Sequence, residues 1–301
     1  MGSRLPHPKR GRSSREETRR QKGPMAAARC APVDPLVLYE ASVQDIKEEL
    51  DFAERIYREA NRRPFRALRE DFCGTAALAA AWVRRGPENS AIGIDLHRRT
   101  LAWAHRHHVA PLGPAASRIR LVCDDVLRVP GPKVDLVAAF NFSYSVFKSR
   151  ELLRRYFHVA RGALTRGGLL ILDAFGGTAA TEVGEERRCI GPLALPGGRL
   201  VPRFTYVWEQ IRFNPVDHRL LCNMHFELPG GIRIKRAFAY DWRYWTLPEL
   251  REIMLEAGFK EIRIYVEGWD EKKNKPTGIY RRRSSIGEMA SWLAYVVGFA
   301  G

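Results

Sequence analysis

The sequence predicts an α/β fold: a Rossmann-like, mostly parallel sheet with helices on both faces, plus a small antiparallel β insertion. Two observations support this prediction. Apolar strand-like runs alternate with amphipathic helical segments between residues 65 and 175, whereas the strand-like segments that follow have no helices between them. With 301 residues, 45% of them hydrophobic, the chain can form one domain with a sizeable insertion or two small domains.

The elements of the parallel part follow from hydrophobic periodicity. Residues 43–60 show helical spacing, and Ser42 is the expected N-cap. The predicted strands are 65–70, 91–95, 118–123, 134–140 and 168–175. The predicted helices between them are 75–85, 98–108 and 149–164.

The second half of the chain predicts the insertion and the return to the main sheet. The insertion strands are expected at 200–213, 218–228 and 231–241, with a hairpin signal in "ELPGGIRI". Thr246 and Glu249 form a capping box that begins a helix, and Gly258 ends it. The last expected elements are strands at 261–267 and 276–281 and an amphipathic helix at 286–298.

These elements divide the chain into four parts. They are a disordered basic tail (1–32), a core (33–175), the insertion (176–245) and a segment that completes the core (246–301). No run of about 18 apolar residues predicts a membrane span. The five cysteines are at least 33 residues apart, which excludes C-x-x-C motifs and favours reduced thiols in a cytoplasmic protein.

The net charge of +16 raises the question of a nucleic-acid partner. Residues 1–30 hold nine basic and two acidic residues and so contribute +7, which leaves +9 for the rest of the chain. The charge is thus concentrated in the tail, which weakens the nucleic-acid interpretation without excluding it. The histidines of "WAHRHHVA" lack a converging carboxylate, so no metal site is expected.

Acidic residues end three successive predicted strands. Glu70 ends the first strand, Asp95 the second, and Asp124 and Asp125 follow the third. Parallel sheets bind ligands outside the carboxyl ends of their strands, where the strand order reverses. An acid at the end of the second strand suits a ribose diol, and one after the third suits an adenine amino group. The pattern therefore predicts an adenosine-containing cofactor.

The segment "EDFCGTA" (70–76), together with "GIDL", "DDVLRVP" and "LTRGGLLILD", resembles the class I S-adenosylmethionine-dependent methyltransferases of the small-molecule type, over about residues 35–281. Phe72 and Ala76 stand where this family commonly has glycines, so Phe72 could narrow the pocket. S-adenosylmethionine has no phosphate and needs fewer close backbone approaches than a dinucleotide does. If Ala76 opens its helix with ordinary backbone angles, a glycine is not needed there.

The resemblance implies S-adenosylmethionine as the cofactor and a set of residues around it. Glu70 and the backbone at 72–74 would hold its methionine end, Asp95 its ribose, and Asp125 and Val126 its adenine. The implied cofactor residues are Glu70, Phe72, Cys73, Gly74, Thr75, Asp95, Leu96, Asp124, Asp125, Val126 and Asn141. No metal is implied.

The substrate side is expected where the loop after the fourth strand meets the insertion. The candidate substrate-binding residues are Tyr144, Trp208, Tyr240 and Arg243, expected to converge beside the methyl group. Tyr144 and Glu209 are the candidate catalytic bases, for a nucleophile that must lose a proton.

The favoured interpretation is a methyltransferase acting on a small molecule, with 176–245 as its substrate lid. Two alternatives remain open: an RNA or protein methyltransferase that uses the basic tail, and a non-catalytic Rossmann-like binding module. Substrate identity and oligomeric state are not predicted.

Overall fold

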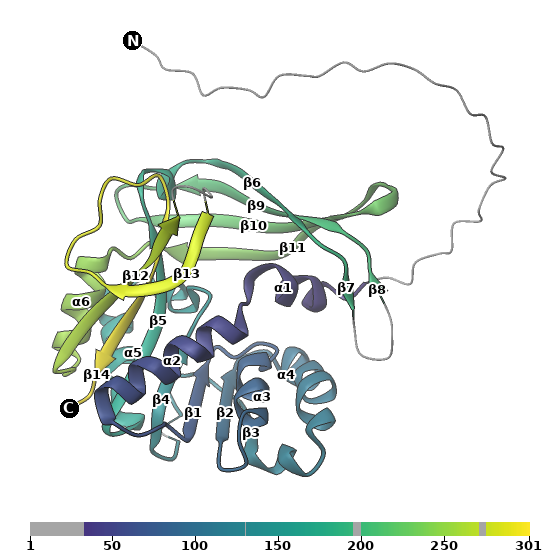
Figure 1. Ribbon diagram of the computed structural model, residues 1–301. Coiled ribbons are helices and arrows are strands. Elements are labelled where there is room, and N and C mark those ends of the chain that lie inside the picture. Colours follow the sequence, from purple (N-terminus) through teal and green to yellow (C-terminus); the bar gives the residue numbers. More distant parts are fainter. Residues whose placement is uncertain (1–32, 130, 195–199, 271–274) are drawn as a thin grey trace, which may run out of the picture. The chain divides into compact units, whose positions relative to one another are not determined.

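The computed structural model describes residues 33–129, 131–194, 200–270 and 275–301; the expected basic tail (1–32) lies outside them. The main feature is an eight-stranded sheet of order β13-β12-β14-β5-β4-β1-β2-β3 (Figure 1). Its parallel strands are β1 (Ala67–Asp71), β2 (Ser90–Asp95), β3 (Ile119–Cys123), β4 (Val134–Ala139) and β5 (Leu164–Gly176). Its antiparallel strands are β12 (Glu261–Asp270), β13 (Lys275–Arg282) and β14 (Trp292–Phe299). The predicted fold class is confirmed.

The last predicted helix, 286–298, is wrong. Trp292–Phe299 instead forms β14, which pairs antiparallel with both β5 and β12. The run from Ala294 to Val297 is buried on both faces of the sheet, and this kind of continuous apolar run does not distinguish a central strand from a helix. Gly298 leaves room for Met254 and Phe259, because a Cβ atom there would lie 2.4 and 2.8 Å from their side chains.

Helices cover both faces of the sheet. They are α1 (Pro35–Val43), α2 (Ile46–Asn61), α3 (Ala77–Arg84), α4 (Arg98–Ala104), α5 (Arg150–Ala163) and α6 (Leu247–Glu256). The predicted first helix is two helices, and Asp45 rather than Ser42 caps the second through a bond from the backbone N of Glu48. The predicted capping box of α6 is present. No helix in the described ranges is long and apolar enough to cross a membrane.

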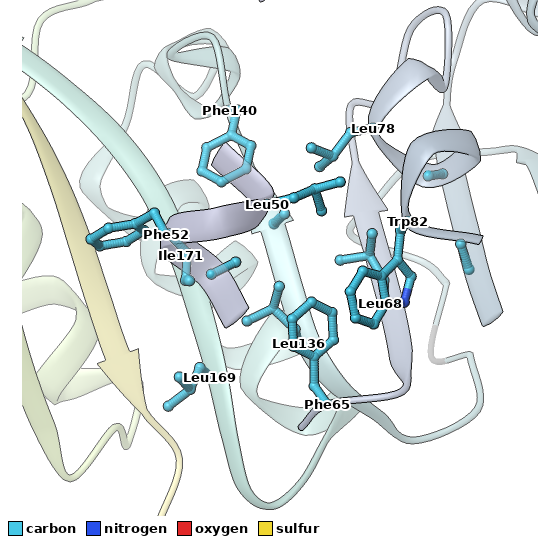
Figure 2. Packing of buried hydrophobic residues seen from close by; sticks show 14 of the residues in the cluster. Leu50, Phe52, Phe65, Leu68, Leu78, Trp82, Leu136, Phe140, Leu169 and Ile171 are labelled. Atoms are coloured by element: carbon cyan, nitrogen blue, oxygen red, sulfur yellow. The ribbon is translucent and has the colours of Figure 1, made fainter. Parts of the chain in front are cut away.

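The core of one sheet face lies under α2 (Figure 2). Leu50 and Phe52 of this helix pack over the strands, together with Leu68 of β1, Leu136 of β4 and Ile171 of β5. Each such side chain contributes about 1.5–3 kcal/mol when fully buried. The other face is covered by α5 and α6. This packing fixes β1 between β2 and β4, the point at which the strand order reverses.

The insertion forms a separate antiparallel sheet of order β11-β10-β9-β6, which lies beside α1 (Figure 1). Its strands are β6 (Gly184–Ile190), β9 (Phe204–Phe213), β10 (Arg219–Leu228) and β11 (Ile232–Arg243). A short pair, β7 (Leu193–Ala194) and β8 (Leu200–Val201), extends from it. The predicted hairpin joins β10 to β11, and Gly230 and Gly231 take φ angles of 78° and 77° in its turn.

Candidate active site

The last residue of β1 and the loop that leads from it to α3, residues 71–76, are here called the cofactor loop. Its backbone is tied to the end of β2 by two hydrogen bonds. Cys73 N donates to Ile94 O at 2.9 Å, and Gly74 N donates to Asp95 Oδ2 at 2.9 Å. A third bond, from Ala76 N to Cys73 O at 2.7 Å, closes the turn. The first two strand ends therefore meet at this loop, as the sequence predicts.

The cofactor loop has left-handed backbone angles at both positions where glycines were expected. The φ angles are 57° at Phe72 and 53° at Ala76, and Gly74 between them has 50°. Ala76 therefore does not open α3 with ordinary helical angles. A non-glycine residue in this region costs about 1–2 kcal/mol. Backbone strain of this kind gathers at functional sites, where the surrounding structure holds it in place.

Phe72 does not narrow the site. Its ring packs against Phe147 and Tyr156, with ring centroids 5.9 and 5.5 Å away. These residues belong to the core under α5 and α6, on the other side of the sheet from α2. The side chain thus anchors the loop to the core.

Glu70, the last residue but one of β1, is a buried carboxylate. Its Oε2 accepts a hydrogen bond from Ala79 N at 3.0 Å and so satisfies a free N–H at the start of α3. Burial raises the pKa of Glu70 to about 8, and the charges of Asp95 and Asp71 add to the shift, while the Ala79 N–H opposes it. A carboxylate in this state is stabilised by an incoming cation. Cys73 and Thr75 beside it are buried, and the Thr75 hydroxyl has no hydrogen-bond partner within the described chain.

Asp95 uses both carboxylate oxygens to shape the strand ends. Oδ2 accepts from Gly74 N, and Oδ1 accepts from His97 N at 2.8 Å. The side chain of Leu96, the residue between Asp95 and His97, is exposed. Each carboxylate oxygen keeps a second acceptor position, so the residue can still accept from a ligand hydroxyl.

The loop after β3 begins with Asp124 and Asp125. The Asp124 carboxylate accepts from Asp125 N and pairs with Arg128, and Asp125 Oδ1 accepts from Leu127 N at 2.9 Å. Val126 is buried against the core. The guanidinium of Arg69 in β1 fixes this loop by donating hydrogen bonds to Val126 O and Val129 O.

Asn141 and Phe142 follow β4 in left-handed conformations, with φ angles of 57° and 55°. Asp173 of β5 holds this turn, because its two carboxylate oxygens accept from Asn141 N at 2.8 Å and Phe142 N at 2.9 Å. Burial raises the pKa of Asp173 to about 7, although the two N–H donors lower it. A second buried carboxylate of raised pKa therefore stands at the strand ends.

Tyr144 occupies a different position from the one predicted. Its side chain is 2% exposed, and its hydroxyl donates to Asp173 O at 2.9 Å. Burial raises its pKa well above the usual value, which opposes loss of its proton. The geometry gives Tyr144 a structural role, in holding the loop after β4 to β5, rather than the role of a base or a substrate contact.

Trp208 and Tyr240 lie together in a group of rings here called the aromatic cluster: Phe142, Phe175, Trp208, Tyr240 and Trp242. The ring centroids of Trp208 and Tyr240 are 5.4 Å apart, and Phe142 lies 4.7 Å from Phe175. The cluster joins one face of the antiparallel sheet to the loop after β4. Of the predicted substrate residues, Trp208 and Tyr240 are therefore next to each other and next to the turn that contains Asn141.

Glu209 and Arg243 do not join this group, because alternate residues of a strand face opposite sides of a sheet. Glu209 accepts from Asn223 Nδ2 at 2.9 Å and from His225 Nε2 at 3.0 Å, and these bonds lower its pKa. Arg243 stacks on the Trp245 ring at 3.8 Å and donates to Lys148 O and Glu249. Both therefore lie on the other face of the antiparallel sheet from Trp208 and Tyr240.

Sequence reasoning missed two residues that interact electrostatically with the carboxylates at the strand ends. Glu49 of α2 is only 8% exposed. Burial raises the pKa of the Tyr39 hydroxyl in α1, and the negative charges of Asp173, Glu49 and Asp95 raise it further. The Tyr39 ring also touches Phe238 of β11 at 5.1 Å. A signal for Glu49 was present in the sequence, since it is an acid on the apolar face of α2, three residues after Ile46 and four before Ala53.

Comparisons with known proteins place this geometry in a known fold. No protein-family model matches the sequence, and no curated protein is significantly similar to it. A methyltransferase from Clostridium acetobutylicum that depends on S-adenosylmethionine has 17% identity and a TM-score of 0.64, covering 88% of this chain and 98% of its own. An amino pentose methyltransferase from Micromonospora echinaspora has 16% identity and a TM-score of 0.62, covering 88% and 96%.

A sugar N-methyltransferase from a Streptoalloteichus species is also similar, with 16% identity and a TM-score of 0.60 over 94% of this chain and 99% of its own. All three similarities extend over 88% or more of this chain and 96% or more of the other chain. The chain has the fold of the class I S-adenosylmethionine-dependent methyltransferases.

Proposed function

We propose that the protein is a methyltransferase that uses S-adenosylmethionine and acts on a small molecule. The observation that carries the proposal is the meeting of Glu70, the cofactor loop and Asp95 at the point where the strand order reverses.

The donor set fits this cofactor better than a dinucleotide. Residues 70–76 contain two carboxylates and no lysine or arginine, so they offer no countercharge to a pyrophosphate. Glu70 suits the ammonium group of the methionine end, and Asp95 suits the ribose hydroxyls. Asp125 and Val126 would face the adenine. When bound, S-adenosylmethionine supplies a methyl group on a positively charged sulfur.

The contribution of the chain is to position the reactants and exclude water. Asp173 fixes the turn at Asn141 and Phe142, and the aromatic cluster connects this turn to the antiparallel sheet. We propose that the insertion, 176–245, closes over the substrate and that Trp208 and Tyr240 contact it. Two of the similar structures act on sugars by their names, which supports a sugar-sized substrate.

Calorimetric titration with S-adenosylmethionine tests the proposal. We expect binding to the unmodified protein and at least tenfold weaker binding to Asp95→Ala, because charge-assisted hydrogen bonds contribute about 1.5–3 kcal/mol each. Leu96→Ala is the matched control, since the exposed neighbouring side chain should not matter. A folded protein that binds no S-adenosylmethionine would favour the non-catalytic binding module instead.

A further inference from the structure

Glu49 is a buried carboxylate without a countercharge. Its side chain is only 8% exposed, and it makes no hydrogen bond or ion pair with any other residue in the described part of the chain. Buried charges in proteins are normally paired, because removing an ion from water carries a large free-energy cost. The protein therefore maintains at this position a group that weakens the ligand-free fold. Such a group is expected where a ligand supplies the missing partner.

The surroundings of Glu49 add negative charge. Burial raises its pKa well above the usual value, and the carboxylates of Asp173 and Glu70 raise it further. The negative charges of Asp173 and Glu49 also both raise the pKa of the Tyr39 hydroxyl. Tyr39 in turn touches Phe238 of the antiparallel sheet. The buried Glu49 carboxyl is thus influenced by the charges of Asp173 and Glu70, and it influences a tyrosine whose ring touches the antiparallel sheet.

We propose that Glu49, together with Asp173, binds the amino group of the substrate, so that the methyl acceptor is an amine. This inference rests on the proposed function. A cation is the ligand that neighbouring uncompensated carboxylates and aromatic faces both attract. An anionic substrate would be repelled, and a neutral alcohol would leave the carboxylates without a countercharge.

The same residue also solves a chemical requirement of the reaction. The bound ammonium group first passes one proton to the ionised carboxylate of Glu49, which frees the nitrogen lone pair. The lone pair then attacks the methyl carbon, and the carbon–sulfur bond breaks with its electron pair remaining on sulfur. The methylated nitrogen carries the positive charge that the sulfur loses. A base of this kind must lie within hydrogen-bond reach of the nitrogen.

The test compares Glu49→Gln with Glu59→Gln, a control at an exposed position of the same helix. The first measurement is the melting temperature of the ligand-free protein. The second is the dissociation constants of S-adenosylmethionine and S-adenosylhomocysteine, which differ in the positive charge on sulfur. The third is binding of glucosamine and glucose, a matched cation and neutral alcohol, to protein saturated with S-adenosylhomocysteine.

We expect Glu49→Gln to raise the melting temperature by about 2 °C or more, because it removes an unpaired buried charge. Both cofactor affinities should stay within about threefold. The unmodified protein and Glu59→Gln should prefer glucosamine to glucose by about tenfold, the ratio given by one charge-assisted hydrogen bond, and Glu49→Gln should lose this preference.

Three results would overturn the inference. A lower melting temperature for Glu49→Gln would mean that the carboxylate stabilises the fold. A loss of S-adenosylmethionine affinity much larger than that of S-adenosylhomocysteine would assign Glu49 to the sulfonium of the cofactor. An unmodified protein with no preference for glucosamine, including one that binds neither sugar, would remove the amine. Failure of the proposed function is recognised separately, as absence of binding of either cofactor form.

Discussion

A buried ion pair in β1 gives a sharp prediction about stability. Arg69 and Asp71 are both 0% exposed, and Arg69 Nε donates to Asp71 Oδ1 at 2.7 Å. Tyr156 donates its hydroxyl to Asp71 Oδ2 at 3.0 Å. The guanidinium also donates to Val129 O at 2.7 Å and to Val126 O at 3.2 Å, in the loop that begins with Asp124. The pair therefore connects β1, α5 and the loop proposed to face adenine.

Replacing one partner should cost far more than replacing both. Arg69→Met leaves Asp71 charged and buried, which typically costs about 3–5 kcal/mol. For domains of this size each kcal/mol lowers the melting temperature by about 2–4 °C, so we expect a fall of roughly 6–20 °C. The double variant Arg69→Met/Asp71→Leu removes both charges, and apolar replacements of a whole buried pair are often close to neutral.

Differential scanning calorimetry and urea unfolding measure these differences. Arg66→Met is the matched control, because its side chain pairs with Glu88 at the surface, where an ion pair contributes about 0–1 kcal/mol. Because Arg69 also holds the carbonyls of Val126 and Val129, its loss should weaken S-adenosylmethionine binding as well. The reasoning is refuted if Arg69→Met costs less than about 1 kcal/mol, or if the two single effects simply add in the double variant.

Three further predictions concern the site itself. The pKa of Glu70 is raised to about 8 in the fold, so its contribution to ligand-free stability should decline as the pH rises through about 8. The affinity for S-adenosylmethionine should rise between about pH 6 and pH 7.5, because Glu70 ionises in this range. Calorimetry should find no such rise for Glu70→Gln. If the rise persists in this variant, Glu70 is not its cause. Ala76→Gly should change stability by no more than about 1 kcal/mol, because relief of about 1–2 kcal/mol at a φ of 53° offsets a lost buried methyl and the added chain entropy of glycine. A tenfold gain in cofactor affinity for this variant would show that the natural loop is impaired. Trp208→Ala should spare cofactor binding and reduce turnover at least tenfold, whereas Glu209→Gln, on the opposite face of the same strand, should leave turnover unchanged; the reverse outcome in a product-release assay would contradict the assignment of faces.

The sequence by itself determined the elements whose signals are local. Alternation of apolar runs with amphipathic helices predicted the parallel sheet, and the acids Glu70 and Asp95 at the strand ends predicted where the site lies. The capping box at Thr246 and the hairpin at 229–231 were also readable, because backbone hydrogen bonding and turn geometry depend on only a few neighbouring residues.

Only the tertiary structure decided what depends on partners far along the chain. The apolar run of residues 292–299 also suits a helix. These residues form a strand because they pair with the backbones of both β5 and β12. The sides of β9 taken by Trp208 and Glu209, the burial of Tyr144 and the left-handed turn at Ala76 were likewise settled by packing. Glu49 shows the physical reason most clearly: a charge on the apolar face of a helix is an anomaly in the sequence, and only in the fold do the charges of Asp173 and Glu70 act on it and raise its pKa.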